Sequence, residues 1–338
     1  KSISIRWVLI SSFASGVSKA KNLLMSEDVL AAIKAIRKLG VKVQIKKNFC
    51  EVHGVGMNGF KYKKNLVINA QNSGTLGRLI SGMLIDTPFP IKIIGDKSLS
   101  KRDFKRVTKP LSKFGATFQL RNNNNLPLVI NGSQKLNSMK FFENKGSAQC
   151  KSSVILAGIK AKGKTFIKAK KSRNHTELLF KYLKLPIKIK KNRNFDFIEI
   201  QKVNKIKPIN YKVPSDISSG AFFIALTVLS ENSQITIKNV NVNPTRTGIT
   251  TILKKMGVKI SFLNKRTYKG ELVADIFVKS PSTLKSINCP SKLNSEAIDE
   301  FLIIFLIAAK AKGISIFKNL DELNKKESPR LKWGSKIL

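Results

Sequence analysis

Residues 72–85 read NSGTLGRLISGMLI: a small and polar start is followed by an apolar helical body that ends with Leu79–Ile85. The same order occurs at four other places in the chain. Those copies begin at Lys1, Ser147, Ser215 and Glu296, and their apolar bodies are Trp7–Phe13, Val154–Ile159, Ala221–Leu229 and Phe301–Ala309. A period of roughly 70–78 residues is the signature of stacked similar repeats. Helices that are apolar nearly all round are expected to be buried.

A second kind of helix, amphipathic and ending in glycine, follows three of these five. The endings are Leu39-Gly40-Val41, Phe114-Gly115-Ala116 and Met256-Gly257-Val258. Glycine just past a helix suits the left-handed cap position. The alternating segments that follow, such as Val41–Ile45 and Val258–Phe262, predict strands. Each repeat is therefore expected to mix helix and strand, and a change of composition predicts a domain junction near residues 205–213.

The net charge is large but spread along the chain. Among 338 residues there are 63 Lys and Arg against 20 Asp and Glu, giving +43. Only 11 of the basic residues are arginine, and the lysines accompany abundant isoleucine and asparagine, as an AT-rich coding bias produces. No aromatic-rich stripe of sequence accompanies them, so no nucleic-acid partner is expected, although the charge should steer anionic substrates. A non-enzymatic basic protein that binds RNA or DNA stays open as an alternative.

Composition argues against membrane, metal and nucleotide sites. The longest apolar run, Phe301–Ala309, is shorter than the roughly 18 residues that a membrane span needs. The three cysteines and two histidines are scattered, so neither a zinc site nor a disulfide framework is expected, and a reducing cytoplasm fits. Gly54-Val-Gly56-Met-Asn-Gly59 matches the dinucleotide fingerprint, but the strand-like Leu66–Asn69 follows it instead of a helix.

The polar helix starts and one charged cluster predict an anion site. A helix N-terminus presents unpaired N–H groups and the positive end of a dipole. If the repeats pack about a common axis, several such ends converge on one phosphate-rich site. Near the end of the chain, Lys326, Glu327 and Arg330 combine two cations with a carboxylate, and Asp299 precedes them on an apolar helix. A carboxylate among cations is a candidate proton carrier, because its neighbours set its pKa.

Taken together, nine stretches resemble motifs of the enolpyruvyl transferase family, in the family's order and over the whole chain. They are Lys1-Ser-Ile-Ser-Ile-Arg6, Asn72-Ser-Gly-Thr75, Gly95-Asp-Lys-Ser-Leu-Ser-Lys-Arg102, Ser147-Ala-Gln149, Ser172-Arg-Asn-His-Thr-Glu177, Pro214-Ser-Asp-Ile-Ser-Ser219, Asn243-Pro-Thr-Arg-Thr-Gly248, Asp299-Glu300 and Lys326-Glu-Ser-Pro-Arg330. The resemblance implies an α/β (α+β) fold, a two-domain inside-out α/β barrel of repeated βαβαββ units. Residues 1–212 would hold three units and residues 213–338 two of three, leaving the second domain incomplete.

The resemblance also implies a reaction. The enolpyruvyl group of phosphoenolpyruvate would pass to the 5-hydroxyl of shikimate 3-phosphate, with release of phosphate and without a metal or organic cofactor, in a cytoplasmic monomer. A sister enzyme that acts on UDP-N-acetylglucosamine is the alternative; it would open with Lys-Asn and carry a reactive Cys where Lys97 and Ser98 stand. The third unit, with its Asp-His-Arg motif, is missing from the matches, so this polypeptide is expected to turn over poorly.

Site residues follow from the same resemblance. The residues expected to bind shikimate 3-phosphate are Lys1, Ser2, Arg6, Ser147, Gln149, Ser172, Asp299 and Lys326. Those expected to bind phosphoenolpyruvate are Lys1, Asn72, Gly74, Arg102, Gln149 and Arg330. Asp299 would be the general base for the 5-hydroxyl, Glu327 would exchange a proton with the methylene carbon, and Lys1 would touch both substrates. Plain alternatives are a helix cap for Ser147 and a surface charge for Arg102, and Pro329 departs from the family pattern.

Overall fold

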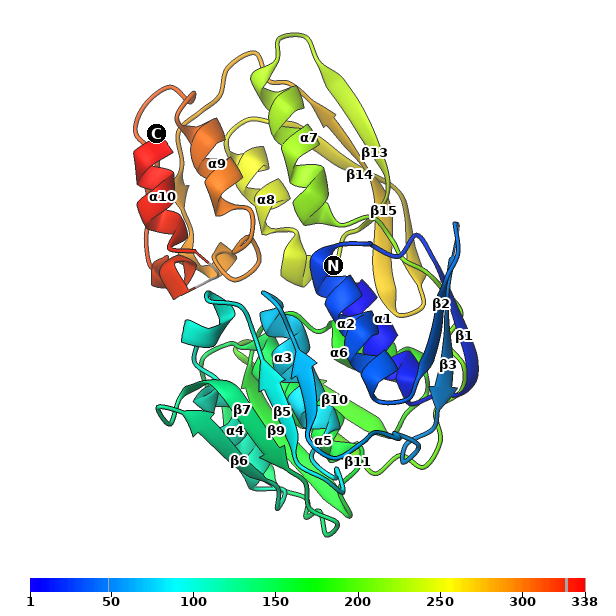
Figure 1. Ribbon diagram of the computed structural model, residues 1–338. Helices are drawn as coiled ribbons and strands as arrows, with labels where there is room; N and C mark the ends of the chain where they lie inside the picture. The colour runs from blue at the N-terminus through cyan, green and yellow to red at the C-terminus, as the bar shows by residue number, and fades with distance from the viewer. Residues whose placement is uncertain (48, 326–327, 338) are drawn as a thin grey trace. The chain divides into compact units, whose positions relative to one another are not determined.

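The computed structural model describes residues 1–47, 49–325 and 328–337 (Figure 1). Contacts divide the chain into an N-terminal unit, Lys1–Val213, and a C-terminal unit, Pro214–Leu338. The expected domain ranges, 1–212 and 213–338, stay a prediction about independently folding domains. In the described part of the chain, no helix has both the length and the apolar character that crossing a membrane requires.

The N-terminal unit alternates short strands with helices. Its first elements are α1 (Ser2–Ser12), β1 (Ser15–Lys21), α2 (Glu27–Lys38), β2 (Lys42–Ile45) and β3 (Phe49–Val55). The next are β4 (Leu66–Asn69), α3 (Gly74–Met83), β5 (Ile91–Ile94), η1 (Leu99–Lys101), α4 (Lys105–Ser112), β6 (Thr117–Arg121) and β7 (Asn125–Asn131). The last are β8 (Lys140–Glu143), α5 (Ala148–Gly158), β9 (Lys164–Lys170), α6 (His175–Tyr182), β10 (Ile187–Lys191), β11 (Phe195–Gln201) and β12 (Tyr211–Lys212).

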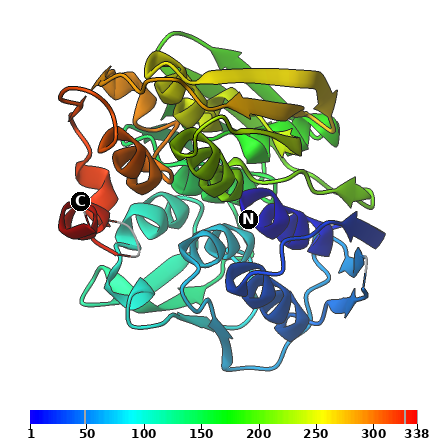
Figure 2. The same cartoon turned by 90° about the horizontal axis from the view of Figure 1, so that it is seen from above.

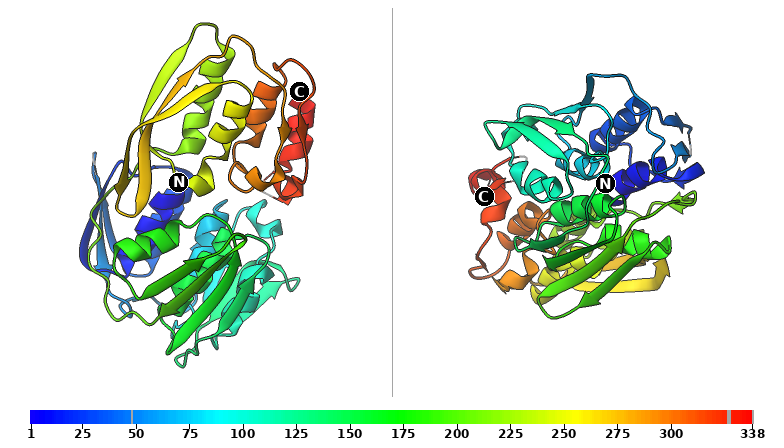
Figure 3. Two further views of the ribbon diagram at one scale, coloured as in Figure 1. Left: turned by 180° about the vertical axis from the view of Figure 1, so that it is seen from behind. Right: turned by 90° about the horizontal axis from the view of Figure 1, so that it is seen from below.

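Three four-stranded sheets in this unit share one strand pattern. Their orders are β12-β1-β3-β2, β4-β5-β7-β6 and β8-β9-β11-β10, the third drawn in green in the left view of Figure 3. In each, the first two strands run parallel and the later pairs are antiparallel. The second and third sheets follow the chain order βαβαββ, so the expected α/β fold of repeated units is confirmed. The first sheet takes its outer strand, β12, from the end of the unit.

The buried helices of the N-terminal unit begin where the sequence predicts. α1, α3 and α5 carry the apolar bodies, and Trp7, Leu79 and Val154 are each exposed by 1% or less. α1 contacts α2 and α3, and these helices are seen in shades of blue in Figure 2. α3 and α5 pack closely enough that a Cβ on Gly82 would lie 2.1 Å from the carbonyl oxygen of Ser153, so only glycine fits there.

The C-terminal unit repeats part of the same pattern. Its elements are α7 (Ile217–Leu229), β13 (Gln234–Asn241), η2 (Pro244–Arg246), α8 (Gly248–Lys255), β14 (Lys259–Tyr268), β15 (Glu271–Lys279), β16 (Asn288–Cys289), η3 (Ser291–Leu293), α9 (Phe301–Ala308), β17 (Ile316–Phe317), η4 (Asp321–Lys325) and α10 (Arg330–Ile337). β15 lies between β13 and β14 in an antiparallel sheet, and β16 pairs with β17 in parallel.

One expectation about these helices is wrong. α7 is apolar all round and was expected to be buried, yet Phe222 is 67% exposed, Phe223 56% and Leu226 66%. The opposite face, with Ile217, packs in the core of its unit. The periodicity of a sequence shows that a helix is apolar, but the neighbours available to cover it are a property of the whole fold.

The glycine caps and the dinucleotide-like stretch behave as predicted. Gly40, Gly115 and Gly257 follow their helices with φ of 85°, 111° and 94°, the left-handed region that favours glycine. β3 ends at Val55, and no helix follows before β4, so the setting of a dinucleotide site is missing from these residues.

Candidate active site

The N-terminal ends of three helices meet at Arg6, which is 4% exposed. Its Nε donates to Oγ1 of Thr176 at 2.8 Å, and its Nη2 donates to Oγ of Ser152 at 3.1 Å. Its Nη1 also donates to the carbonyl oxygen of Ser2 at 3.1 Å. Because these partners lie on α1, α5 and α6, the bonds fix the planar fork of the guanidinium relative to all three helices.

A second junction joins α3 to α5 through Gln149. The side-chain Nε2 of Gln149 donates to Oγ1 of Thr75 at 3.0 Å, and its Oε1 accepts a hydrogen bond from Arg78. Ser147 caps α5 by accepting from the backbone N–H of Cys150 at 3.3 Å. The helix-cap alternative for Ser147 is therefore correct, and a cap can also face a ligand.

Arg102 lies against the backbone of Gly74. A Cβ placed on Gly74 would be 2.6 Å from Nη1 of Arg102, closer than real Cβ contacts. Nearby, Asn72 donates to the carboxylate of Asp96. The absence of a side chain at Gly74 therefore lets a guanidinium approach the first turn of α3, where the helix dipole is positive.

This junction is electrostatically positive. Burial and then the neighbouring Arg102 lower the pKa of Arg78 to about 10. Burial disfavours the charged form of Arg78, and Arg102 repels it as a like charge. Arg78 stays protonated at neutral pH, so two cations and a helix N-terminus share one place. Such an arrangement favours a bound anion that would neutralise part of the charge. Sequence reasoning missed Arg78, which lies one helical turn after the recognised Asn72–Thr75.

Two further predicted residues of this unit, Ser172 and Lys1, lie just before helices. Ser172, 8% exposed, has an Oγ with no hydrogen-bond partner among the described residues, as a group that binds a ligand would have. Ser172 lies four residues before Thr176 in sequence. Lys1 precedes α1, and its Nζ lies 3.3 Å from the carboxylate of Asp28.

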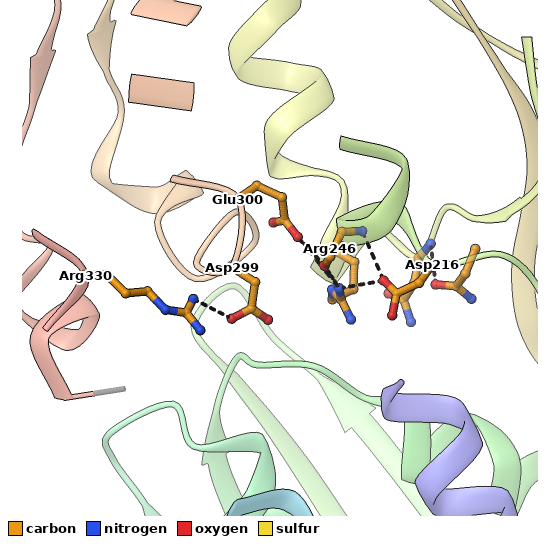
Figure 4. A network of polar contacts seen from close by, with 8 residues as sticks. Asp216, Arg246, Asp299, Glu300 and Arg330 are labelled. Carbon is orange, nitrogen blue, oxygen red and sulfur yellow. Dashed lines mark hydrogen bonds and ion pairs between the residues drawn. The ribbon is translucent and has the colours of Figure 1, made fainter. Parts of the chain in front are cut away.

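In the C-terminal unit, the structure joins Asp299 to Arg330 (Figure 4). Nη1 of Arg330 donates to Oδ1 of Asp299 at 3.2 Å, and both side chains keep partial exposure, 21% and 28%. Asp299 lies in the turn before α9, and Arg330 begins α10. Lys326 and Glu327, which were expected to complete this cluster, lie outside the described residues.

Beside this pair lies a buried network that the sequence did not single out. Nη2 of Arg246 is 3.2 Å from Oδ1 of Asp216 and 3.8 Å from Oε1 of Glu300, and Ser218 donates to Glu300 (Figure 4). Burial alone would raise the pKa of Asp216, but Arg246 and the N–H of Ser218 contribute to holding it below its usual range. The signal was available: these residues occupy three of the nine resembling stretches.

Each unit, taken by itself, holds groups with a distinct chemistry. The N-terminal unit gathers helix N-termini, arginines and hydroxyls, which bind phosphate and carboxylate groups. The C-terminal unit holds a partly exposed carboxylate beside a guanidinium. Such a carboxylate can accept a proton from a bound hydroxyl. Within the described ranges, no group of three or more His, Cys, Asp and Glu side chains could hold a metal ion.

The fold of this chain is similar to that of a solved enolpyruvyl transferase. The enolpyruvyl transferase NikO from Streptomyces tendae superposes with a TM-score of 0.68, over 92% of this chain and 71% of that one. At 13% identity this likeness concerns the fold alone.

Comparison of the sequence identifies a single family. Residues 1–336 match the model of the EPSP synthase (3-phosphoshikimate 1-carboxyvinyltransferase) family, and the chain belongs to that family. A 3-phosphoshikimate 1-carboxyvinyltransferase of Ruthia magnifica is 43% identical over 98% of this chain and 75% of its own length. One from Caldicellulosiruptor bescii is 41% identical over 100% and 78%. An EPSP synthase structure from Acinetobacter baumannii has a TM-score of 0.87 at 37% identity, covering 99% of this chain and 75% of that one.

Proposed function

We propose that this chain transfers the enolpyruvyl group of phosphoenolpyruvate to the 5-hydroxyl of shikimate 3-phosphate, giving 5-enolpyruvylshikimate 3-phosphate and phosphate. The observation that carries the proposal is the junction at Gln149, where α3 and α5 meet beside Arg78. Relatives named for this reaction match nearly the whole chain. The reaction belongs to the shikimate pathway, which leads to aromatic amino acids.

The two substrates are assigned to neighbouring parts of this junction. Phosphoenolpyruvate carries a phosphate and a carboxylate, which suit Arg102 above Gly74 and the N–H groups at the start of α3. Shikimate 3-phosphate would place its phosphate at Ser147 and the buried Oγ of Ser172. Gln149 would contact both substrates, and Arg6, held by its bonds to α1, α5 and α6, would bind the carboxylate of shikimate.

The bond changes follow from these roles. The 5-hydroxyl oxygen attacks C2 of phosphoenolpyruvate while Asp299 takes the hydroxyl proton and C3 gains a proton from Glu327. The tetrahedral intermediate then loses phosphate from C2 and a proton from C3 to Glu327, which restores the methylene group. The hydroxyl proton held by Asp299 passes to the departing phosphate, which regenerates the carboxylate. Arginines already in place meet the charge of the phosphate as it leaves, so little reorganisation is needed. Arg330 would hold Asp299 in position and bind phosphoenolpyruvate.

We further propose that the protein is a monomer, that it is cytoplasmic and that its acceptor substrate is shikimate 3-phosphate. Shikimate 3-phosphate is preferred to UDP-N-acetylglucosamine because the chain opens with Lys1-Ser2 and has no cysteine at residues 97–98. Phosphate release with each acceptor, at equal enzyme concentration, separates the two. Release with only the nucleotide sugar would overturn the choice.

The test of the base is Asp299→Asn, assayed by phosphate release with both substrates. Loss of the proton acceptor is expected to lower kcat by about 10²–10⁴-fold and to leave each KM within about threefold. Asp321→Asn, at an exposed carboxylate of the same unit, is the control and should leave both constants unchanged. The assay uses enzyme at micromolar concentration, so that small residual rates stay measurable. Unchanged release by Asp299→Asn would remove Asp299 from the mechanism.

A further inference from the structure

One face of the sheet β8-β9-β11-β10 presents phenylalanine and lysine to solvent. Along β9, exposed and buried residues alternate from Lys164 to Lys170, so Phe166 and Lys168 lie on the outer face. Three phenylalanines of this face are exposed by 52%, 41% and 40%: Phe142, Phe166 and Phe197. Large apolar side chains rarely gather at the surface without a partner.

Strand pairing aligns these residues into rows. Phe142 on β8 pairs with Lys168 on β9, Lys168 pairs with Phe197 on β11, and Phe197 pairs with Lys190 on β10. Lysine and phenylalanine therefore alternate across all four strands. A second row contains Lys140, Phe166, Glu199 and Lys188.

Lys168 lies at the centre of the aromatic side chains. Its Nζ is 5.0 Å from the ring centroid of Phe142, 4.8 Å from that of Phe195 and 6.0 Å from that of Phe197. The rings of Phe142 and Phe195 are 5.8 Å apart. These contacts are cation–π interactions, so cation and rings form one continuous surface. We call Phe142, Phe166, Lys168, Phe195 and Phe197 the aromatic platform.

Exposed lysines surround the aromatic platform, and there is little negative charge on the same face of the sheet. Lys140, Lys164, Lys170, Lys188 and Lys190 lie on it and are exposed. Glu199 is the acid that pairing places among them, and it already accepts from Lys164 at 3.4 Å. The outer face of the β1-β3-β2 sheet differs, because Lys19 and Lys46 there share Glu51 and the aromatic ring beside them is that of Phe49.

We propose that the aromatic platform binds single-stranded RNA, with bases stacked on the phenylalanine rings and phosphates paired with the surrounding lysines. Rings interleaved with cations are what single-strand binding uses, since every base has a face to stack and every nucleotide a phosphate. Phe142 and Phe197 stand two strands apart, about 10 Å, which leaves room for one nucleotide between two stacked bases. A duplex is not expected to bind as well, because its bases are already stacked on one another.

This proposal departs from the expectation that the chain has no nucleic-acid partner. That expectation depended on the lack of an aromatic stripe in the sequence. The platform takes its rings from β8, β9 and β11, so no single stretch of sequence displays it. A spread of lysines from coding bias alone does not explain why they share one face with phenylalanines and a single acid.

The experiment measures fluorescence anisotropy of a labelled twelve-nucleotide oligo(U) RNA against the full chain, between 50 and 200 mM salt. Binding with a Kd of about 1–100 µM near physiological salt is expected. The variant Phe142→Ser/Phe197→Ser keeps every charge and should weaken binding at least tenfold, because each stacked ring contributes about tenfold. The matched control, Phe222→Ser/Phe223→Ser, removes two exposed rings from α7 and should change nothing.

Charge is tested separately with Lys168→Gln/Lys190→Gln, which should reduce the salt slope by about 0.7 for each lost phosphate contact. This variant also keeps the proposal testable if the serine variant does not fold, which circular dichroism would show. Equal binding by the serine variant and its control would overturn the proposal, since the affinity would then be general charge attraction. Tighter binding to duplex than to oligo(U) would overturn it as well, as would binding only to vesicles of anionic lipid.

Discussion

The ammonium group of Lys151 lies 2.7 Å from the carboxylate of Glu177, with side-chain exposures of 0% and 2%. Asp196 is the second acid near this cation, at 3.9 Å. Lys151 is in the first turns of α5 and Glu177 in the first turn of α6, so the pair ties together the two helices that also hold Gln149 and Thr176. An ion pair this deep in the unit connects the packing of the core to the position of the proposed substrate groups.

Removing one member of this ion pair should lower the free energy of unfolding far more than removing both members. Lys151→Met leaves Glu177 charged in the core and is expected to lower the free energy of unfolding by about 3–5 kcal/mol. Lys151→Met/Glu177→Leu removes the buried charge together with its partner and should recover most of that loss. Urea unfolding of Lys151→Met, of Glu177→Leu and of the double variant measures the coupling. Additive losses would show that the pair is not an energetic unit.

Gly74→Ala should weaken the binding of phosphoenolpyruvate more than the binding of shikimate 3-phosphate. The new methyl group would lie 2.6 Å from Nη1 of Arg102, so the guanidinium must move away. A rise of about tenfold in KM for phosphoenolpyruvate is expected, equivalent to about 1.4 kcal/mol of binding. Gly220→Ala is the control, since its methyl group would meet Ile237 at 3.5 Å, an ordinary contact. An unchanged KM would show that Arg102 does not bind this substrate.

Arg246→Met should loosen the C-terminal unit. It leaves Glu300, which is 0% exposed, and Asp216 without the cation that they share. A loss of about 3–5 kcal/mol is expected for breaking a buried charge network. Hydrogen exchange should quicken in α7 and α9 and stay unchanged in the N-terminal unit. Arg266→Met, at an exposed arginine, should leave exchange as it is; equal effects of both variants would contradict the assignment.

Asp275 should make the stability of the C-terminal sheet depend on pH. Its Oδ1 accepts from the backbone N–H of Asn239 at 2.7 Å and its Oδ2 from Nδ2 of Asn264 at 2.9 Å, where β13 and β14 change register. These bonds, together with Lys238, hold the pKa of Asp275 below its usual range. The folded pKa is the lower one, so the carboxylate stabilises the fold above its ordinary pKa and this contribution disappears as pH falls through the folded pKa.

The measurement is the Tm of the natural chain and of Asp275→Asn across pH 2.5 to 7. The natural chain should melt at the higher temperature near neutrality, and the difference should shrink as the solution becomes acidic. Asp321→Asn, at an exposed carboxylate, serves as the control. A difference in Tm that stays constant with pH would show that the charge of Asp275 does not contribute.

Local sequence patterns predicted the helices and strands of this fold well, because each helix start and each glycine cap depends on a few adjacent residues. Asn72–Thr75 and Gly40 are examples, and α3 and the end of α2 lie where these residues place them. What adjacent residues do not contain is the identity of distant neighbours. The exposure of Phe222, the pairing of Lys151 with Glu177 and the approach of Arg102 to Gly74 all depend on segments brought together by folding.

The residues of the candidate site also fall into those that local sequence identifies and those that only the packing of helices reveals. Sequence motifs named most of its groups, including Gln149 and Asp299, but the roles given to them still await experiment. Arg78 was missed because a cation inside a helix has no distinctive spacing, and its place beside Gln149 becomes visible only when α3 packs on α5. Lys326 and Glu327 keep the roles expected for them as predictions.

The outer strand of the first sheet comes from residues Tyr211–Lys212, which pair with Ala20–Lys21. Trp7 also donates its indole N–H to the carbonyl oxygen of Ile209 at 2.8 Å. During synthesis, β1 must therefore wait for almost the entire N-terminal unit to follow it before its sheet is complete. At about 5–20 residues per second, this delay lasts tens of seconds, during which α1 and β1 depend on chaperones or on provisional contacts to avoid aggregation.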